Sequence, residues 1–346
     1  TFGQGVDTES NNVATVASYS GEDENVILPL YYEVEEGTEL PVRIIAANSF
    51  KNTGVKSLTQ NIEGLVVEQY AFVGSQLESF DFSKTYRIDA HAFENTKLTS
   101  VEMGAYLRLF GEYAFANNTK LTSADISKVS NTNVISQGMF SGCEKLVNVN
   151  LGNSITNISQ EAFKNCSSLE NVDFIKTRIT AINNAAFENC SSIQEVTVSN
   201  SVTSFGYNVF AGCSSLKTLK MYQLFKQSDY DTLVTFMGDL TTSVTKIELL
   251  GTNILEIPTR YFENLSKLKE IVIPNNVATI GAYAFAGCVE LSTLNLPTSL
   301  DFETFSLNAV SDTAWYKNLS DILYVGDVLY LVPGGVSGVL PIKAGT

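Results

Sequence analysis

Five cysteines and one histidine are the residues of this chain with the most recognisable chemistry. Thiolates bind zinc or pair as disulfides, and cysteines in consecutive stacked repeats would lie within disulfide range. Each cysteine, however, follows a phenylalanine by three residues, so one position of a repeat determines the residue type. We therefore expect small, buried free thiols, with a disulfide or a metal site as alternatives. The cysteines are Cys143, Cys166, Cys190, Cys213 and Cys288.

The single histidine, His91, stands two residues before Phe93 in an expected turn. A catalytic histidine needs an acid that orients it and a nucleophile that faces it, and no GxSxG or HExxH motif accompanies this one. We expect a surface turn residue. Acidic residues are numerous enough to include a pair for glycoside hydrolysis, but no pair stands out. The sequence thus predicts a protein that is not an enzyme and has no catalytic residue, metal or cofactor.

The elements that must position these residues are short repeats, each marked by a phenylalanine. The spacing runs from 21 to 26 residues, with a mean of about 23. An apolar residue stands five places before the phenylalanine in ten of eleven repeats, and an aliphatic triplet resembling LxxVxL follows most of them. The last two triplet positions alternate as in a short strand. The repeat phenylalanines are Phe50, Phe72, Phe93, Phe115, Phe140, Phe163, Phe187, Phe210, Phe236, Phe262 and Phe285.

Each repeat is therefore a strand, a turn, a second apolar segment and a turn back. Alone, such a unit cannot bury its apolar side, but parallel stacking packs leucine on leucine and phenylalanine on phenylalanine. We predict a β-rich solenoid of about eleven units of about 23 residues, with a parallel sheet on one face.

Several repeats resemble the bacterial BspA-type leucine-rich repeat. They include ITNISQEAFKNCSSL from Ile155, VTSFGYNVFAGCSSL from Val202 and VATIGAYAFAGCVELSTLNL from Val277. The resemblance covers about residues 40–300. It implies a leucine-rich-repeat solenoid on a secreted or surface-displayed bacterial protein, with binding roles and no catalytic residues. We expect an adhesin-like module that binds a protein or a glycan, either host-derived or basic. The alternatives are an intracellular scaffold and, less favoured, a surface hydrolase.

The charge of the chain is unevenly distributed. Its 37 Asp and Glu exceed its 22 Lys and Arg, and residues 1–40 hold nine acids without a Lys or Arg. With a net charge of −15, the chain lacks the excess of basic residues that is typical of a nucleic-acid-binding protein. No apolar run in the sequence is long enough to span a membrane. We expect no nucleic-acid partner and no membrane insertion by this segment. An extracellular or cell-surface location would require a signal or anchor outside this sequence.

Three regions are expected along the chain. Residues 1–40 form an acidic N-terminal cap or degenerate repeat, and residues 41–300 form the repeat array. An irregular insertion at 222–246 is expected to form a short helix or a long loop. Its Tyr222, Phe225 and Tyr230 either anchor a partner or pack the insertion. Residues 301–346 form a hairpin and cap or begin further repeats.

The candidate ligand face consists of the polar strand residues, which point outward from the sheet. In the early repeats Asp81, Glu102 and Asp125 would stack in one column. Carboxylates about 5 Å apart repel one another unless a cation or basic ligand intervenes. We hypothesise that this face binds a basic partner or a divalent cation; the alternative is an ordinary solvated face. Its other members are Asn148, Asn150, Asn171, Asp173 and Glu195.

Overall fold

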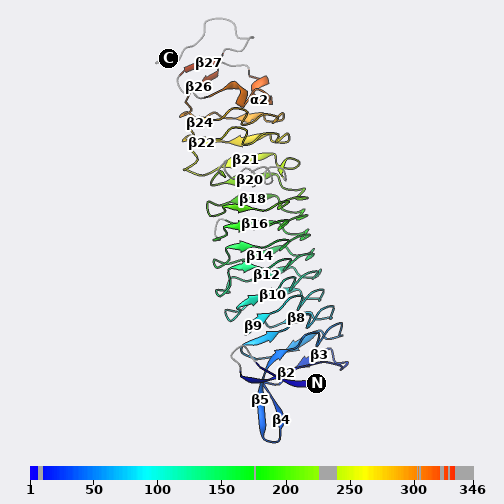
Figure 1. Cartoon of the computed structure of the whole chain (residues 1–346). Coiled ribbons are helices and arrows are strands. Elements are labelled where there is room, and N and C mark those ends of the chain that lie inside the picture. Colours follow the sequence, from blue (N-terminus) through cyan, green and yellow to red (C-terminus); the bar gives the residue numbers. More distant parts are fainter. Residues whose placement is uncertain are drawn as a thin grey trace. The chain divides into compact units, whose positions relative to one another are not determined.

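The chain folds as two compact units, each a stack of short turns (Figure 1). Unit 1 comprises Thr1–Ile193 and Ser204–Cys213, and unit 2 comprises Gln194–Thr203 and Ser214–Thr346. The predicted solenoid of stacked repeats is confirmed. The computed structural model describes residues 1–6, 11–174, 177–225, 240–301, 303, 305–319, 323–325 and 328–331.

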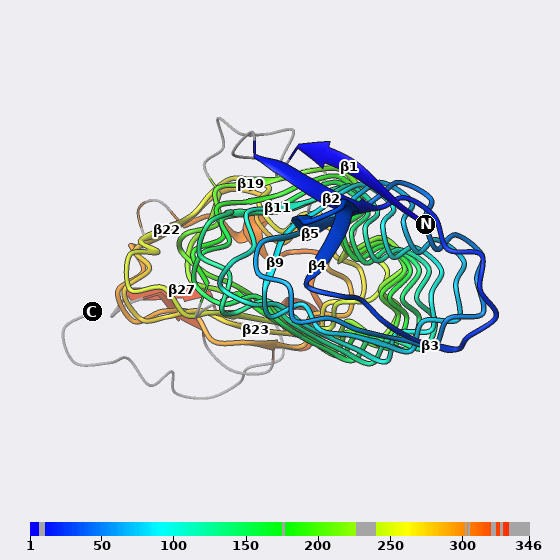
Figure 2. The same ribbon diagram turned by 90° about the horizontal axis from the view of Figure 1, so that it is seen from below.

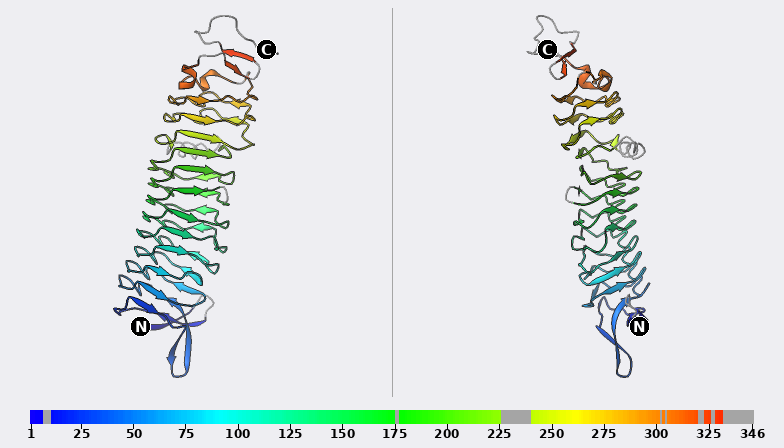
Figure 3. Two further views of the ribbon diagram at one scale, coloured as in Figure 1. Left: turned by 180° about the vertical axis from the view of Figure 1, so that it is seen from behind. Right: turned by 60° about the vertical axis from the view of Figure 1, so that its left-hand side comes forward.

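The first sheet of unit 1 begins with antiparallel strands and continues with parallel ones. A hairpin formed by β4 and β5 projects beyond the first turns (Figures 1 and 3). Tyr19 from the same N-terminal region stacks on Phe50, with ring centroids 5.2 Å apart, and so covers the first repeat phenylalanine. The strands of this sheet are β1 (Phe2–Val6), β2 (Asn12–Val16), β4 (Tyr31–Glu35), β5 (Thr38–Ile45), β7 (Leu65–Val67), β9 (Thr85–Ile88) and β11 (Leu109–Phe110).

The second apolar segment of each later turn of unit 1 also forms a short strand. These strands pair in parallel in the order β13-β15-β17-β19. The expectation of one parallel sheet is therefore incomplete, because each of the two apolar segments of a turn pairs with the equivalent segment of the next turn. The strands are β13 (Val134–Ile135), β15 (Asn157–Ile158), β17 (Ala181–Ile182) and β19 (Ser204–Phe205).

The triplet segments of unit 1 form the sheets β3-β6-β8 and β10-β12-β14, both parallel. Viewed along the stack, successive turns of unit 1 superpose, so residues at one repeat position form a column (Figure 2). The strands are β3 (Asn25–Ile27), β6 (Ser57–Thr59), β8 (Ser79–Phe80), β10 (Ser100–Glu102), β12 (Ser123–Asp125), β14 (Asn148–Asn150) and, with backbone only described, β16 (Asn171–Asp173).

Unit 2 repeats this arrangement with one longer and one shorter parallel set of strands. The longer set is β18 (Glu195–Val198), β20 (Thr218–Met221), β21 (Lys246–Leu249), β23 (Glu270–Val272) and β25 (Thr293–Leu294). The shorter set is β22 (Glu256–Ile257) and β24 (Thr279–Ile280), and the later elements are η2 (Leu307–Ala309), α2 (Ala314–Lys317), β26 (Leu323–Val325) and β27 (Val328–Leu331). The last two strands pair antiparallel, as expected for a hairpin.

The short helix or long loop predicted within the insertion falls on residues 226–239, which lie outside the described residues. In the part of the chain that the structure describes, no helix has the length and hydrophobicity needed to cross a bilayer.

The phenylalanine column forms the centre of the core. From Phe50 to Phe210 in unit 1, successive rings stack with centroids 4.9–5.7 Å apart and interplanar angles of 6–16°. Phe262 and Phe285 stack in the same way in unit 2, 5.7 Å apart. All of these rings are buried. Offset stacking adds to the burial of each ring, so the column stabilises every turn through its two neighbours.

Candidate ligand-binding site

The five cysteines are free and buried, which confirms the expectation of structural thiols. Each Sγ lies 3.0–3.2 Å from the carbonyl oxygen of the preceding repeat's phenylalanine and donates to it. Burial raises the pKa of Cys143 and of Cys288 to about 12. These thiols are therefore protonated at neutral pH, and they act as hydrogen-bond donors between turns.

Asn118 occupies the same repeat position as the cysteines, three residues after Phe115. Its fully buried side chain accepts hydrogen bonds from the amide and hydroxyl of Thr96, at 2.8 and 2.6 Å. It donates to the carbonyl oxygens of Phe93 and Phe115, at 2.9 and 2.8 Å. Sequence analysis missed this role, although the position in the repeat was the available signal.

His91 is more than an exposed turn residue. It has a φ of 59°, and its ring is stacked between Tyr70 and Tyr113, with centroids 4.8 and 5.3 Å away. Its Nδ1 lies 2.6 Å from Glu94 Oε2. The prediction of a turn residue holds, but the side chain also belongs to an aromatic column. These contacts give the histidine a structural role.

The strands β10, β12 and β14 place four of the predicted face residues on one sheet. The register sets Glu102 beside Asp125 and Asp125 beside Asn150. Lys128 Nζ lies 2.6 Å from Glu102 Oε1, and Asn150 donates to Asp125 at 3.4 Å. The repulsion that motivated an external cation is therefore already relieved within the protein. The fourth residue, Asn148, is exposed.

The charge on Asp125 is stabilised locally. Burial alone would raise the pKa of this carboxyl, but hydrogen bonds from Ser127 and Asn150, together with the nearby Lys128 charge, hold it below the usual value. The Ser127 amide and hydroxyl lie 2.8 and 2.6 Å from Asp125 Oδ1. Asp125 is thus ionised and internally bonded.

The remaining predicted face residues lie elsewhere. Asp81 follows β8, which pairs with β6, and its Oδ1 accepts from the Ser83 amide at 2.9 Å. Glu195 belongs to unit 2, where it pairs with Lys220 at 2.7 Å. The side chains of Asn171 and Asp173 lie outside the described part of the structure. Ligand binding by this face remains a prediction.

The predicted insertion contacts differ in accessibility. Tyr222 is 36 % exposed, whereas Phe225 is buried and its amide donates to the Tyr261 hydroxyl at 2.7 Å. Phe225 therefore packs inside unit 2, which agrees with the alternative that this residue packs the insertion rather than anchoring a partner. Tyr230 lies outside the described residues.

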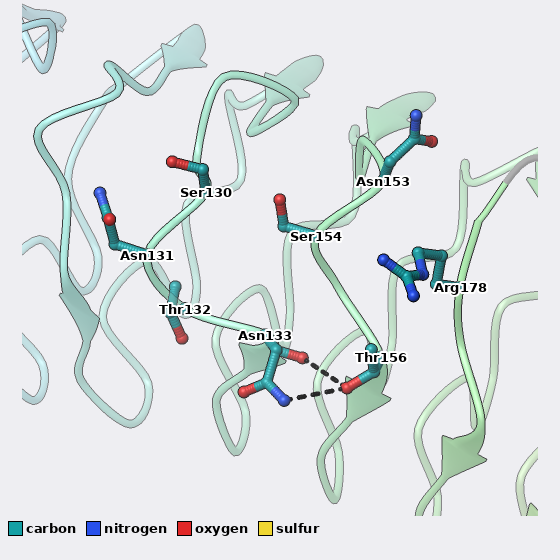
Figure 4. Close-up of a pocket in the computed structure, with 8 residues that line it drawn as sticks. All are labelled: Ser130, Asn131, Thr132, Asn133, Asn153, Ser154, Thr156 and Arg178. Atoms are coloured by element: carbon teal, nitrogen blue, oxygen red, sulfur yellow. Dashed lines mark hydrogen bonds between the residues drawn. The ribbon is translucent and has the colours of Figure 1, made fainter.

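A polar trough in unit 1, which sequence analysis did not predict, is a further candidate site. It has a volume of about 800 Å³ and is formed by three successive loops that connect the two sets of strands. The signal in the sequence was a run of Asn, Ser and Thr before β13 and again before β15. The lining residues are Ser130, Asn131, Thr132, Asn133, Asn153, Ser154, Thr156 and Arg178 (Figure 4).

Two side-chain amides of the trough are held in place. Asn133 Nδ2 donates to Thr156 Oγ1 at 3.1 Å, and the Thr156 hydroxyl donates back to the Asn133 carbonyl at 3.4 Å. Asn131 donates to the Ala105 carbonyl at 3.0 Å and accepts from Arg108 Nη1. These bonds fix which amide atoms remain available to a ligand.

Arg178 provides the only charge among the lining residues. Figure 4 shows its guanidinium directed from its own loop toward the loop that carries Ser154 and Thr156. The side chain is exposed, and no acidic group among the described residues pairs with it. The arrangement offers hydrogen-bonding groups and one uncompensated cation, which suits recognition of a polar ligand.

Stacked turns with a phenylalanine spine and two sets of short parallel strands define a leucine-rich-repeat solenoid. Residues 43–133, 126–233 and 235–322 match the family described as the BspA type leucine rich repeat region, in six copies. The chain belongs to this family, and the resemblance noted in the sequence is confirmed.

Several solved structures are similar to this chain at low sequence identity, and the first of them shares its fold. A leucine-rich repeat protein from Bacteroides ovatus is 17% identical, with a TM-score of 0.55 and coverage of 87% of this chain and 88% of that one. A leucine rich cell surface protein from Faecalibacterium prausnitzii is 18% identical, with a TM-score of 0.38 and coverage of 86% and 76%. The pneumococcal vaccine antigen PcpA is 16% identical, with a TM-score of 0.41 and coverage of 82% and 92%. No curated protein matches the chain.

Proposed function

We propose that the chain is a non-catalytic binding protein that a bacterium displays on its surface or secretes. The feature that supports this proposal is the trough of unit 1. Its eight lining side chains are all polar, although the core of the solenoid uses none of them. Polar groups that converge on a concave surface can fix the orientation of a bound ligand.

Binding is favoured over catalysis by the composition of this surface. Glycoside hydrolysis needs two carboxyl groups beside the scissile bond, and the described residues that line the trough include no Asp or Glu. The recognisable nucleophiles and bases already have structural roles: the ladder thiols are buried donors, and His91 is stacked between two tyrosines.

A location on or outside the cell is favoured over an intracellular scaffold by membership of the BspA-type family, which carries the expectation of surface display or secretion. Protease treatment of intact cells, followed by immunoblotting of the chain, separates these alternatives. Digestion in intact cells, or recovery from the medium, supports the proposal. Protection until lysis would favour the scaffold.

The binding function itself is tested with the purified chain on arrays of glycans and extracellular matrix proteins. We expect specific, saturable binding to at least one immobilised class. Turnover of any bound glycan or peptide, abolished by a single Asp or Glu substitution, would contradict the non-catalytic assignment. Absence of binding to every class would contradict the binding function.

A further inference from the structure

We propose that the trough of unit 1 binds an acidic saccharide, whose carboxylate pairs with Arg178 and whose hydroxyl groups bond to the Asn, Ser and Thr side chains. This assignment rests on the proposed binding function and specifies its ligand class.

Arg178 lines the trough and has no internal counter-charge in the described structure, in a chain whose net charge is −15. Some cations of unit 1 are compensated: Lys128 lies 2.6 Å from Glu102, and Lys164 lies 2.9 Å from Glu188. Lys120 and Arg178 form no ion pair among the described residues, and of these two only Arg178 lines the trough. Arg108, beside the trough, bonds to the neutral Asn131 rather than to a carboxylate. A guanidinium presents a planar fork of N–H donors that matches a carboxylate in a bidentate pair.

The neutral lining is suited to hydroxyl groups. Amide and hydroxyl side chains each supply donors and acceptors, as a sugar hydroxyl requires. Asn133 and Thr156 are held by their mutual bonds, which reduces the entropy lost on binding. The side chains of Ser130, Asn153 and Ser154 have no hydrogen-bond partner within the described residues and are available to a ligand.

The dimensions and the absence of apolar lining narrow the ligand class. Neighbouring turns lie about 4.8 Å apart, so the three loops extend over roughly 10 Å, enough for one or two sugar rings. Among the described residues no aliphatic or aromatic side chain lines the trough, so these residues offer an acidic peptide no pocket for its side chains. One uncompensated arginine is too little for nucleic acid, which needs several phosphate contacts.

Calorimetric titration and saturation-transfer NMR on the full chain test this assignment. The acidic probes are sialyllactose and galacturonic acid oligomers; the matched neutral probes are lactose and the methyl esters of the same oligomers. We expect the acids to bind about tenfold to hundredfold more tightly, the range for one charge-assisted pair. Arg178→Gln should remove this preference and leave the neutral probes unchanged. Asn133→Ala should weaken both kinds of probe.

Lys120→Gln is the matched control, because it removes one exposed positive charge from unit 1 without touching the trough. It should leave every affinity unchanged, and melting curves should show that all variants fold. Equal binding of acids and neutral analogues, or an Arg178→Gln variant with full acid affinity, would overturn the assignment while leaving a binding function intact. Displacement of the acids by inorganic sulfate at equal concentration would overturn the saccharide part. Failure of the array experiment would instead remove the proposed function.

Discussion

Replacing Asn118 should destabilise unit 1 more than any exposed substitution. The side chain makes four buried hydrogen bonds, three of which join its turn to the preceding one. Asn118→Ala removes all four and leaves the Thr96 amide and the Phe93 carbonyl without their partner. Each such bond contributes about 0.5–1.5 kcal/mol net, and a buried unpaired group costs about 1–3 kcal/mol, so we expect a loss of about 3–5 kcal/mol.

A second variant separates the hydrogen bonds from packing alone. Asn118→Cys places the ladder thiol at this position, where Sγ can donate to the Phe93 carbonyl as the other cysteines donate in their repeats. It cannot accept as well from Thr96, so we expect it to recover about 1–2 kcal/mol. Asn153→Ala, an exposed asparagine, is the control and should change stability by less than about 0.5 kcal/mol.

Urea unfolding followed by circular dichroism gives the stability, and hydrogen exchange at the Thr96 amide locates the effect. Exchange is needed because repeat proteins can unfold in parts rather than in one step. The reasoning is refuted if Asn118→Ala matches Asn153→Ala, if Asn118→Cys is no more stable than Asn118→Ala, or if exchange at Thr96 does not accelerate.

Further perturbations test other parts of the repeat. Phe163→Ala removes a buried ring stacked on both sides and should cost about 3–5 kcal/mol in urea unfolding. The five ladder thiols should resist a thiol reagent at mildly alkaline pH and react together on denaturation, because burial keeps them protonated. Gly138→Ala places a Cβ 2.1 Å from the Tyr113 ring at a φ of +58° and should lower the melting temperature, whereas Gly54→Ala, which meets nothing within 4 Å, should not. The pKa of Asp125 is lower in the folded state than in the unfolded state. Its ionised carboxylate therefore stabilises the fold fully at a pH above the unfolded-state pKa, and this contribution is lost as the pH falls through the folded-state pKa. Asp125→Asn should flatten the pH dependence of unfolding below about pH 4.

Each of these expectations has a contradicting outcome. A wild-type melting point for Phe163→Ala would mean that the neighbouring turns collapse into the cavity. Labelling of a single ladder thiol in the folded protein would identify a locally open turn. An unchanged pH profile in Asp125→Asn would show that its bonds to Ser127 persist in the unfolded chain. If Gly138→Ala and Gly54→Ala changed the melting temperature equally, neither the positive φ of Gly138 nor the close Tyr113 ring would explain the effect.

The periodic part of the fold could be predicted because every repeat imposes the same requirement. An apolar side chain in one turn can be covered only by its equivalent in the next, so phenylalanine spacing alone predicts the column from Phe50 to Phe210. The thiol ladder follows for the same reason. Asn118 was missed because a polar residue at a buried position is intelligible only once its partners in the preceding turn are known.

The candidate site was predicted less well because it depends on loops and on individual pairs. Periodicity placed Glu102 beside Asp125, but it did not reveal that Lys128 reaches back across a turn to neutralise Glu102. The trough arises where three loops of different length come together, and loop conformation has no periodic signal. Polar runs such as those before β13 occur on many surfaces, and the structure alone shows that these line a hollow.

The thiol-to-carbonyl bonds of the ladder join each turn only to the one before it. Removal of residues 166–189 would join Asn165 to Cys190 and place the Cys190 thiol beneath the Phe140 carbonyl, with the same donor, acceptor and ring stack as Cys166 has at present. Unequal recombination between such similar coding segments can therefore lengthen or shorten the gene by whole turns without creating a mismatched junction. The trough behaves differently, because it requires three particular loops in order. A lineage that gains or loses turns elsewhere would retain the trough, and one that recombines within residues 130–178 would change the side chains that line it.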